Sequence, residues 1–287
     1  MLKNFTFFFL VLIGFILAGC KKINPPEEIP SYLFIPYATF ATDSVNQGTM
    51  LHDFTDVWVF KGDEFIGCYP TGSRVPVLAE GNTVIKMRAG IKNAGVASLR
   101  SIYTLTQFYE TTINLKRGQI DTLIPVFEYF SGISFLRMES FSNPGTIFTP
   151  TPSSDTFLVN YPGTGSEALD GQGNCGFVYL DQTYQVFEVQ TGSSIPYQIQ
   201  GRVCYLEIQC KTNSDLFVSV SDGANDVRLC GTIYDTEGRW KKIYIPLTDN
   251  LNTFPTLYNF YLILRATRLA DKPDPRIYID NIKVIRQ

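Results

Sequence analysis

The chain has 287 residues, of which 45% are hydrophobic, 14% aromatic and 18% charged, so it can bury a sizeable core. Its formal net charge is −3, and after the first twenty residues no basic run is longer than Lys21-Lys22. This argues against nucleic acid as a partner, because phosphate binding needs clustered lysine and arginine. The only histidine is His52 and no Cys-x-x-Cys pair is present, which argues against a structural zinc site.

The first twenty residues have the pattern of an export signal. Lys3 precedes an apolar run over residues 5–17, and Leu17-Ala18-Gly19-Cys20 follows it. A charged leader, an apolar core of this length and small residues before a cut are typical of a secretory signal and not of a spanning helix. The end of this segment resembles the lipobox of bacterial lipoproteins, which implies removal of residues 1–19 and acylation of Cys20. The alternative is an ordinary secretory signal that ends in cysteine.

Residues 20–36 are rich in proline, and this composition predicts a stiff, extended tether between the lipid and the folded part of the chain. Lys21 follows the cysteine, with no aspartate beside it. By analogy with the sorting of lipoproteins in other bacteria, this favours an outer-membrane location.

Residues 37–130 carry short alternating segments with turn signals between them. Residues 56–60 and 64–69 flank Lys61-Gly62-Asp63, which predicts a hairpin. Further strands are predicted over residues 82–89, 109–115 and 121–127. This spacing predicts a small β-sandwich. The stretches around Tyr69-Pro70 and over residues 89–95 resemble the immunoglobulin-like or transthyretin-like modules of Bacteroidota surface lipoproteins.

Residues 131–287 predict a second, larger β-domain. Strands are expected over residues 133–138, 202–211, 216–221, 227–233, 239–246, 258–266 and 276–285. About eight strands of this length suit a two-sheet jelly roll. The segments 238–247 and 277–284 resemble carbohydrate-binding-module and galactose-binding-like jelly rolls. The fold class predicted for the whole chain is therefore all-β, with an N-terminal β-sandwich followed by a C-terminal jelly roll.

The cysteines beyond Cys20 leave two interpretations open. Five remain, an odd number, so they cannot all pair within the chain. Cys204 and Cys210 are expected on one face of one strand. They are either small buried hydrophobic residues or partners of Cys230 in a cross-strand disulfide, which an exported protein permits.

Nothing in the sequence predicts catalysis. His52 lies in an expected loop, and neither a Gly-x-Ser-x-Gly elbow nor a phosphate-binding loop is present. Glycoside hydrolysis by a pair of acids is the weaker alternative. The acids considered for it are Glu139, Asp181, Glu188, Glu207 and Asp222.

The jelly-roll resemblance implies a structural calcium ion. In such modules a glutamate after the first strand and an aspartate in the last strand bind calcium, and Glu139 and Asp280 match those positions. The family's glycine after the acid is Ser140 here, which counts against the site. The alternative role for Asp280 is a local hydrogen bond at a β-bulge, because the apolar alternation changes phase between Ile279 and Ile282.

Polar and aromatic side chains alternate away from the expected core of the jelly roll, and they predict a ligand-binding face. Sugars bind through aromatic rings against their apolar faces and through amides and charges on their hydroxyls. The predicted ligand-binding residues are Tyr205, Glu207, Gln209, Trp240, Tyr244, Tyr261 and Arg265. The alternatives are a solvated outer face or a face covered by the first domain.

These observations predict a non-catalytic lipoprotein of the outer membrane that binds carbohydrate through its jelly roll. Its expected partners are the membrane, through the lipid, and either a glycan or an outer-membrane protein. The alternative function is a structural or accessory subunit of an outer-membrane transport, secretion or motility complex.

Overall fold

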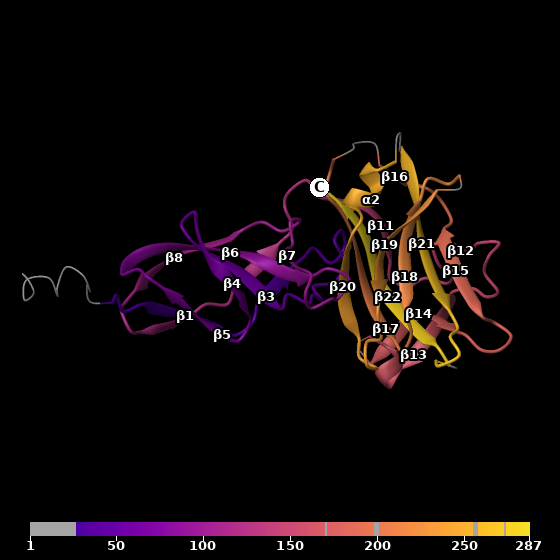
Figure 1. Ribbon diagram of the computed structural model, residues 1–287, viewed down its shortest axis with the longest axis horizontal. Coiled ribbons are helices and arrows are strands. Elements are labelled where there is room, and N and C mark those ends of the chain that lie inside the picture. The colour runs from indigo at the N-terminus through magenta and orange to yellow at the C-terminus, as the bar shows by residue number, and fades with distance from the viewer. Residues whose placement is uncertain (1–26, 170, 198–200, 225, 255–257, 273) are drawn as a thin grey trace, which may run out of the picture.

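The computed structural model describes residues 27–287, with the exception of residues 170, 198–200, 225, 255–257 and 273. The predicted signal and Cys20 lie outside the described residues. The chain forms two β-sandwiches that lie end to end along the long axis of the molecule (Figure 1). The all-β fold class is confirmed. In the described part of the chain, no helix is long and apolar enough to cross a membrane.

The N-terminal sandwich surrounds its own hydrophobic cluster. One sheet, called the β6 sheet, contains β4 (Glu64–Pro70), β3 (Asp56–Lys61), β6 (Gly81–Lys92), β7 (Arg100–Ile102) and β8 (Tyr109–Leu115). The other layer contains β5 (Ser73–Val77), β1 (Ser31–Ile35) and β9 (Ile120–Thr122), and the pair β10 (Val126–Glu128) and β2 (Thr39–Ala41). The predicted hairpin is confirmed, since β3 and β4 pair antiparallel across Gly62, whose φ is +57°.

The start of the first sandwich corrects the predicted tether. Residues 31–35, placed in the tether by their proline-rich context, form β1, which pairs with both β5 and β9. Ser31, Leu33 and Ile35 are fully buried. The alternation of apolar residues at positions 33 and 35 therefore outweighs the neighbouring prolines. The predicted strand over residues 121–127 is also divided, into β9 and β10, because Pro125 cannot donate to a ladder.

The C-terminal jelly roll has two six-stranded sheets. The β22 sheet contains β13 (Val159–Thr164), β14 (Gln172–Tyr179), β22 (Arg276–Arg286), β17 (Cys204–Thr212), β20 (Lys241–Pro246) and β11 (Ser134–Glu139). The β21 sheet contains β12 (Phe148–Pro150), β15 (Val186–Thr191), β21 (Asn259–Thr267), β18 (Leu216–Ser221), β19 (Val227–Ile233) and β16 (Ile195–Pro196). A 3-10 turn, η1 (Gly165–Glu167), and a short helix, α2 (Thr248–Asn252), complete it.

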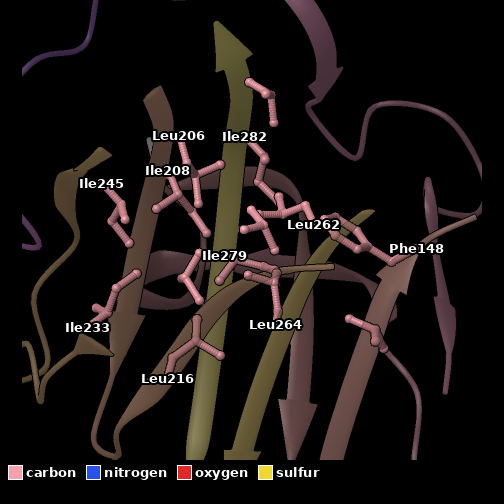
Figure 2. Close-up of a cluster of buried hydrophobic side chains, with 14 of the residues drawn as sticks. Phe148, Leu206, Ile208, Leu216, Ile233, Ile245, Leu262, Leu264, Ile279 and Ile282 are labelled. Carbon is pink, nitrogen blue, oxygen red and sulfur yellow. The ribbon is translucent and has the colours of Figure 1, made fainter. Parts of the chain in front are cut away.

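The core of the jelly roll lies between these two sheets. Figure 2 shows Leu206 and Ile208 of β17 and Ile279 of β22 on one side, and Leu262 and Leu264 of β21 on the other. Each of these side chains is at most 1% exposed, and burial of one such side chain contributes about 1.5–3 kcal/mol.

The cysteines follow the first of the two interpretations. Cys204 and Cys210 point into this core and are fully buried, and Cys230 packs against it. All five cysteines of the described residues are free thiols.

The predicted β-bulge in the last strand is confirmed. The register between β17 and β22 shifts between Glu207 and Gln209, opposite Asn281 and Ile282. Asn281 has a φ of +45°, a conformation that asparagine tolerates better than most residues. Because of the extra residue, the apolar side chains on both sides of the bulge point into the same core.

The two sandwiches are joined through the edge strand β20. The Ala94 N–H donates to the Tyr244 carbonyl oxygen at 2.8 Å, and Asn93 bridges Tyr244 in parallel register. Tyr205, Tyr244 and Ile285 of the jelly roll belong to the hydrophobic cluster of the N-terminal sandwich. The two modules therefore share a packed junction.

Candidate functional site

The residues predicted to bind a ligand lie on two opposite faces of the jelly roll. Tyr205, Glu207 and Gln209 of β17, and Tyr244 of β20, are on the outer face of the β22 sheet, and Trp240 directly precedes β20 on the same side. Tyr261 and Arg265 are on β21, in the other sheet. The structure therefore does not bring the seven residues together into one groove.

The prediction that the β17 and β20 residues form an open face is wrong. Tyr205 is 7% exposed, Glu207 and Tyr244 are 1% exposed and Gln209 is 4% exposed. The N-terminal sandwich packs against this part of the sheet, where the Tyr244 hydroxyl accepts the Asp53 N–H at 3.2 Å. Polar alternation marks a face that is not the core of its own domain, but it does not say whether water or another domain covers that face.

Glu207 lies at the centre of this junction as a buried ion. Its Oε2 is 2.8 Å from the Lys242 Nζ and 3.9 Å from the Lys283 Nζ. The Tyr103 and Tyr129 hydroxyls of the N-terminal sandwich donate to its Oε1 at 2.5 and 2.7 Å. Each of the three charged side chains is at most 2% exposed. One carboxylate thus ties both modules together.

The pKa values of the junction follow from this geometry. Burial alone would raise the pKa of Glu207, but the charges of Lys242 and Lys283 and the hydrogen bonds outweigh it and lower the pKa to about 2. Burial lowers the pKa of Lys283 to about 8, against the opposing pull of Glu207. Glu207 is therefore ionised at neutral pH and acts as a structural ion.

The two carboxylates predicted to bind calcium already accept backbone N–H groups. The Glu139 Oε1 and Oε2 each accept a backbone N–H at 2.8 Å, from Phe141 and Ile147. Asp280 accepts the N–H of Asn281 at 2.6 Å. Calcium takes six to eight oxygen ligands. Within the described residues, no group of three or more His, Cys, Asp or Glu side chains is placed to hold a metal. The observed geometry favours the alternative role for Asp280.

Tyr261 and Arg265 lie on the outer face of the β21 sheet, on the side of the jelly roll away from the N-terminal sandwich (Figure 1). Arg265 is opposite Glu188 of β15 and Phe217 of β18 in the strand register. Gln190 of β15 lies on the same face, because side chains alternate along a strand. These five residues define the free face.

The free face has a pre-ordered polar centre. The Arg265 Nη1 lies 2.5 Å from the Glu188 Oε2, and the side chains are 41% and 16% exposed. The Thr151 hydroxyl donates to the Glu188 Oε1 at 2.6 Å. Burial raises the pKa of Glu188, but the hydrogen bonds from Thr151 and Arg265 outweigh it, so that the pKa is lowered. Glu188 is therefore ionised at neutral pH, beside the Arg265 guanidinium.

The Tyr261 ring is held in place by a glycine turn. An added Cβ at Gly223, whose φ is +84°, would meet the Tyr261 ring at 2.7 Å. The ring therefore packs on the backbone of this turn. Beyond it, Val227 and Leu229 of β19 are 55% and 56% exposed. The free face thus combines a fixed aromatic ring, exposed apolar side chains and a fixed pair of opposite charges.

No family model and no curated protein matches this chain. Among solved structures, a variant of the carbohydrate-binding module CBM29-2 is similar at 12% identity and a TM-score of 0.34, over 55% of this chain and 92% of the module. A CBM29-2 variant in complex with mannohexaose is similar at 12% identity and 0.34, over 54% and 91%. The module TmCBM61 in complex with β-1,4-galactotriose is similar at 14% identity and 0.30, over 55% and 90%. At these values the likeness carries no argument about a ligand.

Three residues of the free face were not predicted as ligand-binding: Glu188, Gln190 and Phe217. The segment 186–191 alternates, with Phe187, Val189 and Thr191 buried, and this pattern was the available signal for β15.

Three of the acids considered for hydrolysis have other partners. Glu139 accepts backbone N–H groups, whereas Glu188 and Glu207 are ion-paired.

Proposed function

We propose that this chain is a non-catalytic carbohydrate-binding lipoprotein, and that the free face of its jelly roll holds the glycan. The observation that supports this proposal is the placement of the Tyr261 ring and the Arg265–Glu188 pair on one face, with Tyr261 and Arg265 four residues apart on β21. Of the seven residues predicted to bind a ligand, Tyr261 and Arg265 are the two on this face.

The chemistry of the free face suits a sugar. The flat Tyr261 ring offers an apolar surface to the C–H face of a pyranose ring. The Arg265 guanidinium donates to hydroxyl oxygens, and the Glu188 carboxylate accepts from hydroxyl groups. Because Thr151 and Arg265 already hold Glu188, little side-chain order has to be gained on binding.

The test is a glycan array with the wild-type chain, followed by titration of any glycan that binds. Tyr261→Ala and Arg265→Ala are each expected to raise the Kd about tenfold or more, which corresponds to a loss of about 1.4 kcal/mol of binding free energy. Tyr234→Ala is the matched control, because this tyrosine is 58% exposed and lies outside the free face. Binding that is unchanged in both free-face variants, or an array on which nothing binds, would contradict the proposal.

The lipid anchor is part of the same proposal. The first described residues lie at the end of the N-terminal sandwich that is remote from the jelly roll (Figure 1). An anchor on Cys20 would therefore leave the free face turned away from the membrane. Radiolabelled palmitate is expected to label the wild-type chain and not Cys20→Ala, and the labelled chain is expected in the outer-membrane fraction. Label that persists in Cys20→Ala would contradict the acylation site.

A patch on the N-terminal sandwich favours a second candidate function, that of a subunit in an outer-membrane complex. On the outer face of the β6 sheet, the Phe65 ring lies 5.3 Å from that of Trp58 and 5.2 Å from that of Phe60. The Arg88 guanidinium lies 4.6 Å from the Phe108 ring. Phe65 and Phe108 are 49% and 44% exposed. Clustered exposed rings with arginine are enriched at protein interfaces.

Chemical cross-linking in intact cells tests this second function. A single adduct of constant mass that forms with the wild-type chain and is lost in Phe65→Asp would support a partner protein. Equal cross-linking of wild type and Phe65→Asp would argue against it. The array and the cross-linking are independent, so either function can fail alone.

A further inference from the structure

A cleft of 310 Å³ lies at the junction of the two sandwiches, on a different face of the jelly roll from the free face. His52 and Asp53 of the N-terminal sandwich line one side of it. Gln209, Trp240 and Lys241 of the jelly roll line the other side. This volume is at the lower end of the range for small-molecule pockets, roughly 300–1,000 Å³. The cleft is therefore large enough for a small ligand.

Gln209 is the first sign of a ligand in this junction cleft. Its side chain is only 4% exposed and lines the cleft. Within the part of the chain that the structure describes, its amide makes no side-chain hydrogen bond, and it is not one of the fully inaccessible unpartnered groups, so it is accessible from the cleft. An amide that reaches a cleft without a protein partner is available to a ligand. A bound molecule with hydroxyl groups would satisfy both its N–H₂ and its carbonyl oxygen.

Two aromatic rings, those of Trp240 and His52, also line the cleft. The Trp240 Nε1 is buried and has no hydrogen-bond partner among the described residues. The His52 Nδ1 accepts the Phe54 N–H at 3.2 Å, so the proton of the neutral imidazole is on Nε2. The pKa of His52 is lowered, mainly by burial and to a smaller extent by the charge of Lys242. The lower pKa favours the neutral ring. Because the Trp240 Nε1 is itself inaccessible, the indole offers its ring to the cleft and not its N–H.

The charges at the cleft balance. Asp53 and Lys241 bring one negative and one positive charge, and within the described residues neither has an ion-pair partner at 4.0 Å or less. The third charged residue of the lining, Lys242, is already paired with Glu207. Asp53 would repel an anionic ligand, and Lys241 would repel a cationic ligand. A neutral molecule that both donates and accepts hydrogen bonds is repelled by neither residue and can bond to both.

We infer that the junction cleft binds a small neutral polyol, of the size of a single saccharide unit, with its hydroxyl groups on Asp53, Gln209 and Lys241 and its apolar face beside Trp240. The site lies in the wall between the two modules, whereas the proposed glycan site is on the free face. The two sites therefore stand or fall separately.

The two tryptophans of the chain, Trp58 and Trp240, allow a direct test. In Trp58→Phe, Trp240 is the only indole, and its fluorescence reports on the cleft. Glucose, galactose, mannose, xylose and N-acetylglucosamine are titrated to about 50 mM, well above a Kd of roughly 1 mM, which corresponds to about −4 kcal/mol. We expect at least one of them to change the Trp240 emission with saturation. A ¹⁹F-tryptophan NMR spectrum of the otherwise wild-type chain repeats the measurement without the Trp58 substitution.

Variants then assign the signal to the cleft. Gln209→Leu and Asp53→Asn, each made in the Trp58→Phe background, are expected to weaken the saturating change by about tenfold or more. Because Gln209 is buried, Asp53→Asn on the half-buried rim provides a second test if Gln209→Leu does not fold. Tyr261→Ala is the matched control and is expected to leave the change intact, because Tyr261 is on the free face.

Three results would overturn the inference. The first is no saturating change with any of the five sugars in either the fluorescence or the NMR measurement. The second is a change that survives in both cleft variants. The third is saturation by sodium acetate or ethylammonium chloride in place of the sugars, which would mean that the cleft selects a charge. Loss of array binding in Tyr261→Ala with an intact Trp240 response would leave this inference standing.

Discussion

Replacement of Glu207 by glutamine is the sharpest test of the junction. The change keeps the shape of the side chain and removes its charge, which leaves Lys242 and Lys283 buried at the junction without a carboxylate. The pKa of Glu207 falls from 4.5 to about 2 on folding. At 1.36 kcal/mol per unit this corresponds to about 3 kcal/mol of stabilisation. Removal of one partner from a buried ion pair typically costs about 3–5 kcal/mol. We therefore expect a loss of about 3 kcal/mol in Glu207→Gln at pH 7.

The pH dependence of stability provides a second test of the role of Glu207. Because the folded pKa of Glu207 lies below the unfolded pKa, its stabilisation is present in full above about pH 4.5 and is lost as the pH falls through about 2. Urea unfolding at pH 7 and at pH 3 measures the difference between the two forms, which is expected to shrink at the lower pH. Glu237→Gln is the matched control, since Glu237 is 71% exposed and pairs with Arg239 at the surface. A Glu207→Gln variant within about 0.5 kcal/mol of wild type at pH 7 would refute the reasoning.

The other predictions concern single features of the jelly roll and the junction. Lys283→Met is expected to cost less than Glu207→Gln in urea unfolding, because Lys242 still neutralises the carboxylate; an equal or larger cost would be contrary to this expectation. Gly176→Ala places a Cβ 2.5 Å from the Phe141 ring, so we expect a loss of about 1–3 kcal/mol in thermal unfolding, and a neutral result would mean that the ring moves aside. Calcium or EDTA is expected to leave Tm unchanged in calorimetry, whereas a rise with calcium would restore the predicted metal site. In the folded chain Cys210 is expected to resist a thiol reagent, because it is fully buried, and mass spectrometry that finds it modified without unfolding would contradict this.

Most strands were predictable because their alternation was long and regular. The segments predicted over residues 109–115, 216–221 and 227–233 are strands with the same bounds. The bulge in β22 was also predictable, since the phase of its apolar residues changes within one strand. These features depend on neighbouring residues alone, so the sequence carries them directly.

The candidate site was only partly predictable, because a face of a strand is defined by what lies opposite. The alternation of Tyr205, Glu207 and Gln209 away from the jelly-roll core was interpreted correctly as a second face. Its covering by Tyr103 and Tyr129 depends on contacts across more than seventy residues of chain. No periodicity records a contact of this kind. For the same reason, Tyr261 and Arg265 could be assigned to an outer face but not to the sheet opposite the junction.

The pairing of Asn93 and Ala94 with Tyr244 has a consequence for how the protein can be divided. β20 is the edge strand of its sheet, and an uncovered edge offers its backbone groups to any other strand it meets. In the intact chain the N-terminal sandwich occupies part of this edge and shields Tyr205, Tyr244 and Ile285 from water. In a jelly roll produced alone, the β20 edge would be uncovered, and we expect the domain to aggregate through this strand. The first module therefore covers an edge and an apolar surface of the second, and the two are best produced as one chain.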